Sequence, residues 1–225
     1  MGMRVAGLCS GGKDSVYALW LAMGQGHEVA HIVAMIPRRE DSWMFHFPNI
    51  QLIDLFAKCL GLPLVKSETS GEREAELEDL KGVLQTLDIE GVVSGAIASN
   101  YQKGHIDSIC EELGLKSIAP LWGKEPLELL REFIAAGFEA IVTSVSAEGF
   151  DESWLGRKLD EAAVRDLLEL HRKYKVNLSG EGGEYESLVL DAPFFEKRIE
   201  PVEVESVWRG TNGYLTIKQA KLVEK

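Results

Sequence analysis

The stretch VAGLCSGGKDSVYALWLAM, residues 5–23, consists of an apolar run, a short polar turn and a second apolar run. The first run is typical of a buried β-strand, whereas the apolar residues after the turn recur at helical spacing. A helix that begins after such a turn presents unpaired backbone N–H groups and the positive end of its dipole. The turn therefore predicts a phosphate site, and its expected binding groups are Ser10, Gly11, Gly12, Lys13 and Ser15.

The turn differs from a Walker A loop at one position. Residues 7–13 nearly spell the pattern G-x-x-x-x-G-K, but Asp14 stands where that loop has a magnesium-binding Ser or Thr. A carboxylate beside bound phosphate repels it unless the carboxylate holds a cation. We therefore interpret Asp14 as a Mg²⁺ ligand, directly or through water. The alternative is a tight turn that binds nothing, for which one Gly-Gly pair would be enough.

The first half of the chain alternates short apolar runs with amphipathic helical patterns, as in βα units that build a parallel sheet. The expected strands of this half are 4–9, 29–36, 63–67, 91–97 and 118–122, and the expected helices are 16–23, 53–60, 77–87 and 106–113. The stretch PLWGKEP at 120–126 predicts a hinge, because two prolines and a glycine interrupt it. Beyond the hinge we expect helices at 127–136 and 160–174 and strands at 140–145, 187–190, 201–208 and 213–222.

Composition excludes several classes of protein. A net charge of -12 over 225 residues opposes stable nucleic-acid binding, because affinity for the phosphate backbone requires clustered Lys and Arg. The three cysteines form no CxxC pair, so neither a zinc site nor a disulfide framework is expected. The chain shows no signal-peptide pattern and no apolar run of about 18 residues. We therefore expect a cytoplasmic protein without a membrane span.

The SGGKDS turn resembles the PP-loop of the N-type ATP pyrophosphatases, which cleave ATP between its α- and β-phosphates. Four further stretches resemble the diphthine-ammonia ligase family, and they cover most of the chain in the right order. These are GAIASNYQKGHID at 95–107, PLWG at 120–123, SAEGFDESWLGRKLD at 146–160 and GEGGEYESLVLDAPFF at 180–195.

The resemblance implies a Rossmann-like, HUP or adenine nucleotide alpha hydrolase-like, α/β fold with helices on both faces of a parallel sheet. It implies a PP-loop ATP-binding domain at 1–122 and a smaller α/β substrate-binding domain at 123–225. The implied reaction is the last step of diphthamide biosynthesis, the amidation of diphthine on translation elongation factor 2. ATP with Mg²⁺ would adenylate the diphthine carboxylate and release pyrophosphate, and ammonia from ammonium would then displace AMP.

Free ammonium is the expected nitrogen source, because the chain has neither an N-terminal Cys nor a separate glutaminase-sized domain. The sequence leaves open whether the protein forms a homo-oligomer. Two other functions also stay open, namely a different PP-loop enzyme that acts on tRNA and a non-enzymatic module that senses ATP.

Ligands of doubly wound sheets bind beyond the carboxyl ends of the strands, so Met35, Gly95 and Ala96 are candidates for the nucleotide site. The alternative for these residues is ordinary packing at the strand ends. Residues 38–49 are long and rich in aromatic and charged side chains, which suggests a lid that includes His46. Arg157 is a candidate partner of phosphate or carboxylate, with a surface position as the alternative.

The loop GEGGEYES at 180–187 is the second candidate site, because its glutamates repel phosphate and favour a cation. The resemblance implies a substrate with a trimethylammonium group, which carboxylates and aromatic faces such as that of Tyr185 would bind. The loop would therefore recognise the diphthine cation or admit ammonium, or it would only close the cleft; the alternative is a turn with solvated glutamates. We expect Lys13, Asp14 and Glu184 to be catalytic. The residues expected to bind the substrate are Tyr101, Gln102, Trp122, Trp154, Glu181, Gly182, Gly183 and Glu186.

Overall fold

The computed structural model describes residues 2–37, 49–70 and 73–225. Its first part is a five-stranded sheet in the order β3-β2-β1-β4-β5, in which every neighbouring pair is parallel. The strands are β1 (Arg4–Leu8), β2 (Glu28–Pro37), β3 (Leu64–Thr69), β4 (Gly91–Val93) and β5 (Lys116–Ile118). The helices are α1 (Lys13–Gly24), α2 (Ile53–Leu60), α3 (Arg73–Leu84) and α4 (Asn100–Leu113), with a 3-10 turn η1 (Ile50–Leu52) before α2.

Two buried clusters lie on opposite faces of this sheet. Helices α1 and α2 contribute Leu19 and Phe56 to one cluster, and α3 and α4 contribute Leu80 and Ile109 to the other. The apolar stripes read from the sequence therefore face the sheet from both sides. This arrangement confirms the expected α/β fold with a doubly wound parallel sheet.

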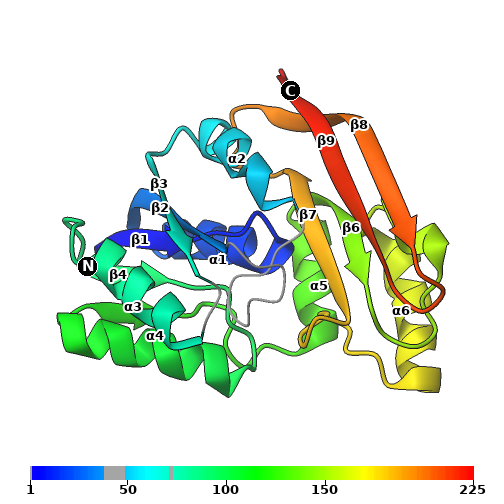
Figure 1. Ribbon diagram of the computed structural model, residues 1–225, viewed down its shortest axis with the longest axis horizontal. Coiled ribbons are helices and arrows are strands. Elements are labelled where there is room, and N and C mark those ends of the chain that lie inside the picture. Colours follow the sequence, from blue (N-terminus) through cyan, green and yellow to red (C-terminus); the bar gives the residue numbers. More distant parts are fainter. Residues whose placement is uncertain (1, 38–48, 71–72) are drawn as a thin grey trace.

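The second part of the chain adds an antiparallel sheet in the order β7-β6-β9-β8, on the right in Figure 1. Its elements are α5 (Pro126–Ala135), β6 (Glu139–Val145), η2 (Glu152–Trp154), α6 (Glu161–Tyr174), β7 (Tyr185–Asp191), β8 (Arg198–Trp208) and β9 (Gly213–Val223). Helix α2 of the first part lies beside the β8–β9 hairpin, where the side chain of Asn49 pairs with the backbone of Leu215 and Ile217. One buried cluster runs through both parts, so the domain boundary after residue 122 stays a prediction.

The strand expected at 118–122 is wrong in its position. The observed strand β5 ends at Ile118 and begins earlier, directly after the left-handed cap of α4 at Gly114 (φ 69°). Pro120 has no N–H for a sheet ladder, and the chain turns there, with Trp122 N–H donating to Ala119 O at 3.1 Å. The strand expected at 91–97 also ends early, at Val93, because the chain then leaves the sheet to pass over the start of α1.

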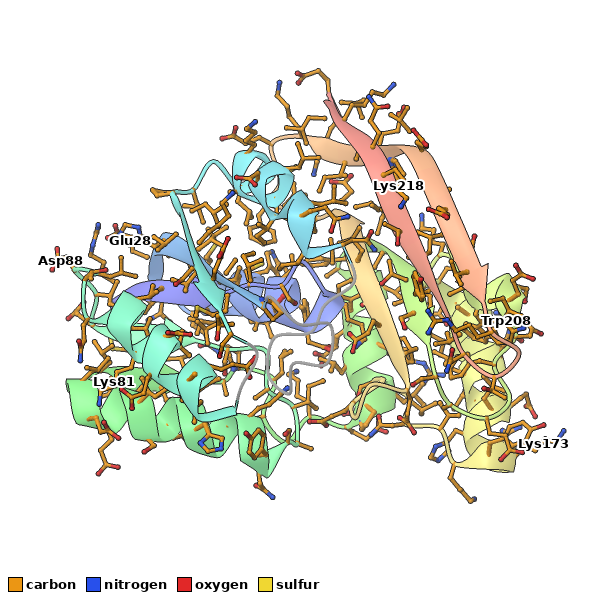
Figure 2. All side chains as sticks on the ribbon, viewed as in Figure 1. Glu28, Lys81, Asp88, Lys173, Trp208 and Lys218 are labelled. Atoms are coloured by element: carbon orange, nitrogen blue, oxygen red, sulfur yellow. The ribbon has the colours of Figure 1, made fainter. Side chains whose placement is uncertain are left out.

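Charged side chains cover the outside of the molecule. Figure 2 shows the labelled Asp88 and Lys173 projecting outward from opposite ends of the protein. Along the edge strand β8, Val202 and Val204 are exposed among glutamates. Among the described residues, the structure contains no helix with the length and apolar character of a membrane span.

Candidate functional site

The SGGKDS turn connects the carboxyl end of β1 to the start of α1, as its sequence predicts. Gly11 has φ +85°, and a Cβ at this position would lie 2.9 Å from the ring of Phe56, so both the backbone and the space require glycine. The hydroxyls of Ser10 and Ser15 lie 3.1 Å apart, and Ser15 Oγ donates to Gly12 O at 3.1 Å. These contacts hold the turn in shape around the first N–H groups of α1.

Lys13 is the buried positive charge of the turn, with only 4% of its surface exposed. Its Nζ donates to both Asp14 oxygens at 2.8 and 2.9 Å and to Ser179 O at 2.5 Å, and it lies 5.4 Å from the centre of the Tyr185 ring. Burial lowers the pKa of Lys13, but the charge and hydrogen bond of Asp14, together with Tyr185 and Glu186, outweigh burial and hold the pKa above its ordinary value. Lys13 is therefore a permanent cation inside the protein.

Asp14 is one-third exposed, so its carboxylate combines a contact with Lys13 and access to solvent. Burial raises the pKa of Asp14 above its ordinary value, and the Lys13 charge opposes this shift. Among the described residues, no group of three or more His, Cys, Asp or Glu side chains is placed to hold a metal ion. A metal bound by Asp14 would take its other ligands from phosphate oxygens and water.

Strand β7 of the second sheet supports the turn directly. The N–H of Val189 donates to Gly11 O at 3.0 Å, and the Lys13 N–H donates to Ser187 Oγ at 3.3 Å. Together with the contact of Lys13 to Ser179 O, these bonds place residues from both sheets around one turn. The local sequence of the turn contains no sign of these partners, which lie more than 160 positions later.

A cavity of about 680 Å³ opens beside the turn, within the usual size range of small-molecule sites. It lies between the carboxyl ends of β1, β2 and β4, the start of α4 and the loop before β7. The expected site residues that line it are Ser10, Gly12, Lys13, Asp14, Ser15, Met35, Gly95, Ala96, Tyr101, Gln102, Glu181, Gly182, Gly183 and Glu186. The structure thus brings most of the expected site together.

Gly95 brings the connection between β4 and α4 against the start of α1. A Cβ at Gly95 would lie 2.7 Å from Ser15 N and 2.8 Å from the carbonyl carbon of Asp14, both backbone atoms. Only glycine allows this approach without moving one of the two segments. Gly95 therefore helps to position the turn and also lines the cavity.

The three glutamates of the loop at 180–187 have different environments. Glu181 Oε1 accepts from the N–H groups of Ala98 and Ser99 at 2.9 and 2.5 Å, at the start of α4. The Glu184 carboxylate accepts from Asn177 N–H at 2.9 Å and does not line the cavity. Glu186 lines the cavity. Burial raises its pKa to about 7, while the Lys13 charge opposes this shift and the Asp14 charge adds to it.

Several expected site residues lie away from the cavity. Trp154 is buried against Phe150, and the Arg157 guanidinium lies 4.4 Å from its ring centre and pairs with Asp166. Trp122 is 37% exposed, with Lys103 Nζ 5.3 Å from its ring centre. Gly11 and Glu184 likewise do not line the cavity, although Gly11 shapes the turn. The substrate-binding roles of the two tryptophans and the catalytic role of Glu184 stay predictions. Most of the suggested lid, including His46, lies outside the described residues.

Sequence reasoning missed two polar groups of the cavity. The Ser179 carbonyl accepts from Lys13, and no side-chain pattern indicates such a backbone contact. The Ser94 hydroxyl lines the cavity, is buried, and has no hydrogen-bond partner among the described residues. Its position directly after β4 is a signal that could have identified it, because ligands bind at strand ends in this fold.

Comparisons with known proteins match both halves of the chain. The family model of the diphthamide synthase N-terminal domain matches residues 3–117, and that of the C-terminal domain matches residues 125–223. The diphthine–ammonia ligases of Mus musculus and Homo sapiens are 36% and 34% identical, over 98% and 99% of this chain and 91% of each relative. A protein of the same name from Schizosaccharomyces pombe is 36% identical over 96% of this chain, which spans 39% of that longer protein.

A solved structure titled as a predicted subunit of tRNA methyltransferase from Methanocaldococcus jannaschii matches with a TM-score of 0.47 and 17% identity, over 85% of this chain and 98% of that one. This likeness is too low to indicate a shared function. The two family models and the relatives confirm the resemblance stated from the sequence, because they match both halves of the chain. The chain therefore belongs to the diphthamide synthase family.

Proposed function

We propose that this protein is an ATP-dependent diphthine–ammonia ligase, which forms diphthamide, AMP and pyrophosphate by way of an acyl-adenylate. The observation that carries the proposal is the match of both halves of the chain to diphthamide synthase domains and to relatives named diphthine–ammonia ligase. The proposed protein substrate is diphthine-modified elongation factor 2. A carboxylate resists attack by ammonia until one of its oxygens becomes a leaving group, and adenylation provides that change.

The SGGKDS turn is the proposed grip for the pyrophosphate part of ATP. The turn at the start of α1 lines the cavity, a helix start presents N–H groups and the positive end of its dipole to anions, and Lys13 adds a buried positive charge there. Negative charge develops on the pyrophosphate as it leaves, and fixed N–H groups with a neighbouring cation stabilise it there. Met35, Gly95 and Ala96 line the same cavity and are the proposed contacts of the nucleoside.

Asp14 fits the role of a Mg²⁺ ligand, because it lines the cavity and keeps one-third of its side chain exposed. Mg²⁺ would neutralise charge on the phosphates during pyrophosphate release. Lys13 holds the Asp14 carboxylate in place through both of its oxygens. We therefore propose that Lys13 and Asp14 act as a unit, in which one group provides positive charge and the other orients a cation.

The test is one reaction that contains the purified protein, ATP, Mg²⁺, ammonium and diphthine-bearing elongation factor 2. AMP, pyrophosphate and the mass of the modified factor are measured together. We expect AMP and pyrophosphate in equal amounts, together with a mass change from carboxylic acid to amide that requires ammonium. Release of AMP that depends on tRNA and ignores the factor would refute the proposal, as would nucleotide binding without pyrophosphate release.

A further inference from the structure

Among the described residues, Glu186 differs from the other two glutamates of its loop in having no hydrogen-bond or ion-pair partner. Glu181 and Glu184 are both held by backbone N–H groups. In the described part of the chain, no hydrogen bond or ion pair involves the Glu186 carboxylate, although it lines the cavity. A half-buried carboxylate without a partner is costly, so its retention in a ligand cavity suggests that the partner is a ligand.

The local charges favour a cation at Glu186. Lys13 is the nearby positive charge of this wall, but both Asp14 oxygens already lie within 2.9 Å of its Nζ. Burial raises the pKa of Glu186, Lys13 opposes this shift, and Asp14 adds to it less strongly than Lys13 opposes it. Lys13 therefore attracts the Glu186 carboxylate without a hydrogen bond to it among the described residues, and a cation bound at Glu186 would stabilise its charged form.

The surroundings favour a small monovalent cation over the two other cations of the reaction. A quaternary ammonium group needs open aromatic faces, whereas the Tyr185 ring is buried, lies beside Lys13 and has its hydroxyl bonded to Leu178 O. Mg²⁺ has its proposed ligand in Asp14 and would take its other ligands from phosphate oxygens and water, so it does not require Glu186. Ammonium needs one carboxylate and a few further acceptors, and the backbone of the glycine-rich loop lines the same cavity.

We propose that Glu186 binds the ammonium ion and holds it in the cavity beside the PP-loop, where the acyl-adenylate would form. This proposal rests on the proposed function and adds the binding site of its nitrogen substrate. Gly182 and Gly183 expose the backbone of the same loop to the cavity, and a Cβ at either position would meet no atom within 4 Å. A small ion can therefore reach the carboxylate from the cavity side.

The test compares two nucleophiles in the variant Glu186→Gln. Ammonium is a cation at neutral pH and must lose a proton before ammonia attacks an acyl-adenylate, whereas hydroxylamine is largely neutral there and attacks without that loss. We expect the KM for ammonium to rise about tenfold or more, because this is the fold-change for loss of one charge-assisted hydrogen bond. The KM for hydroxylamine should change about twofold or less. Glu186→Asp keeps the charge and should recover part of the ammonium affinity. The control variant Glu203→Gln removes an exposed carboxylate of β8 and should leave both constants unchanged.

Factor-dependent exchange of pyrophosphate into ATP without ammonium measures adenylation alone. We expect Glu186→Gln to keep this exchange and its Mg²⁺ dependence. The ammonium site would be overturned by an equal loss of activity with both nucleophiles or by an unchanged KM for ammonium. A shifted Mg²⁺ requirement would also overturn it, because that result would assign Glu186 to the metal. If the proposed function itself were wrong, the wild-type protein would show no ammonium-dependent product at all, so the two failures are distinct.

Discussion

Replacing Gly95 with Ala tests whether the close approach of the β4–α4 connection holds the PP-loop in place. The added Cβ would lie 2.7 Å from Ser15 N, 2.8 Å from the carbonyl carbon of Asp14 and 3.0 Å from its oxygen. All three are backbone atoms, so no side-chain rotation relieves the contact. Ordinary van der Waals contact begins at 3.4 Å, and one segment must therefore withdraw by about 0.7 Å.

The cost follows from this overlap. Overpacking by one methyl group in a well-packed region costs about 1–3 kcal/mol of the free energy of unfolding. In a chain of this size each kcal/mol lowers the Tm by about 2–4 °C. Because both segments line the cavity and one of them carries the N–H groups and Asp14 of the PP-loop, we expect withdrawal of either to lower ATP affinity about tenfold or more in the folded variant.

Thermal unfolding and calorimetric titration with ATP and Mg²⁺ measure the two effects separately. Gly104→Ala is the matched control, because it makes the same change inside α4 at a position where a Cβ would meet no atom within 4 Å. The control should raise stability by about 0.5–1 kcal/mol, since Ala is the better helix former, and should leave ATP binding unchanged. If Gly95→Ala kept wild-type Tm and ATP affinity, the inferred role of the close contact would be wrong.

Three further variants probe the charges of the site. Lys13→Ala should weaken ATP binding about tenfold or more by calorimetry, because it removes the buried cation beside the turn; unchanged affinity would contradict its role. Asp14→Ala should abolish Mg²⁺-dependent pyrophosphate release, and full activity would exclude it as the metal ligand. Burial raises the pKa of Glu186 from 4.5 to about 7, so the folded protein binds this proton more tightly and its stability falls as pH rises through that window. Glu186→Gln should therefore have a higher Tm than wild type at pH 8 and the same Tm near pH 4.5, whereas equal differences at both pH values would refute this.

The PP-loop and the parallel sheet were predictable from the sequence because their signals are local. The strand, the turn and the helix that meet at Lys13 follow one another within about 20 residues, and the apolar spacing of each helix indicates the face that it buries. The carboxyl ends of parallel strands lie along one edge of the sheet, so Met35 and Gly95 could be assigned to the same site.

Chain segments far apart in the sequence determine the rest of the site, and only the tertiary structure could show it. Ser179, Ser187 and Val189 support the turn from the second sheet, and their partners depend on how that sheet packs. The glutamates at 181, 184 and 186 look alike in the sequence, yet two are held by backbone N–H groups and the third faces the cavity. Residue type determines what a carboxylate is able to bind, but the folded chain decides which partners reach it, and therefore which carboxylate remains available to a ligand.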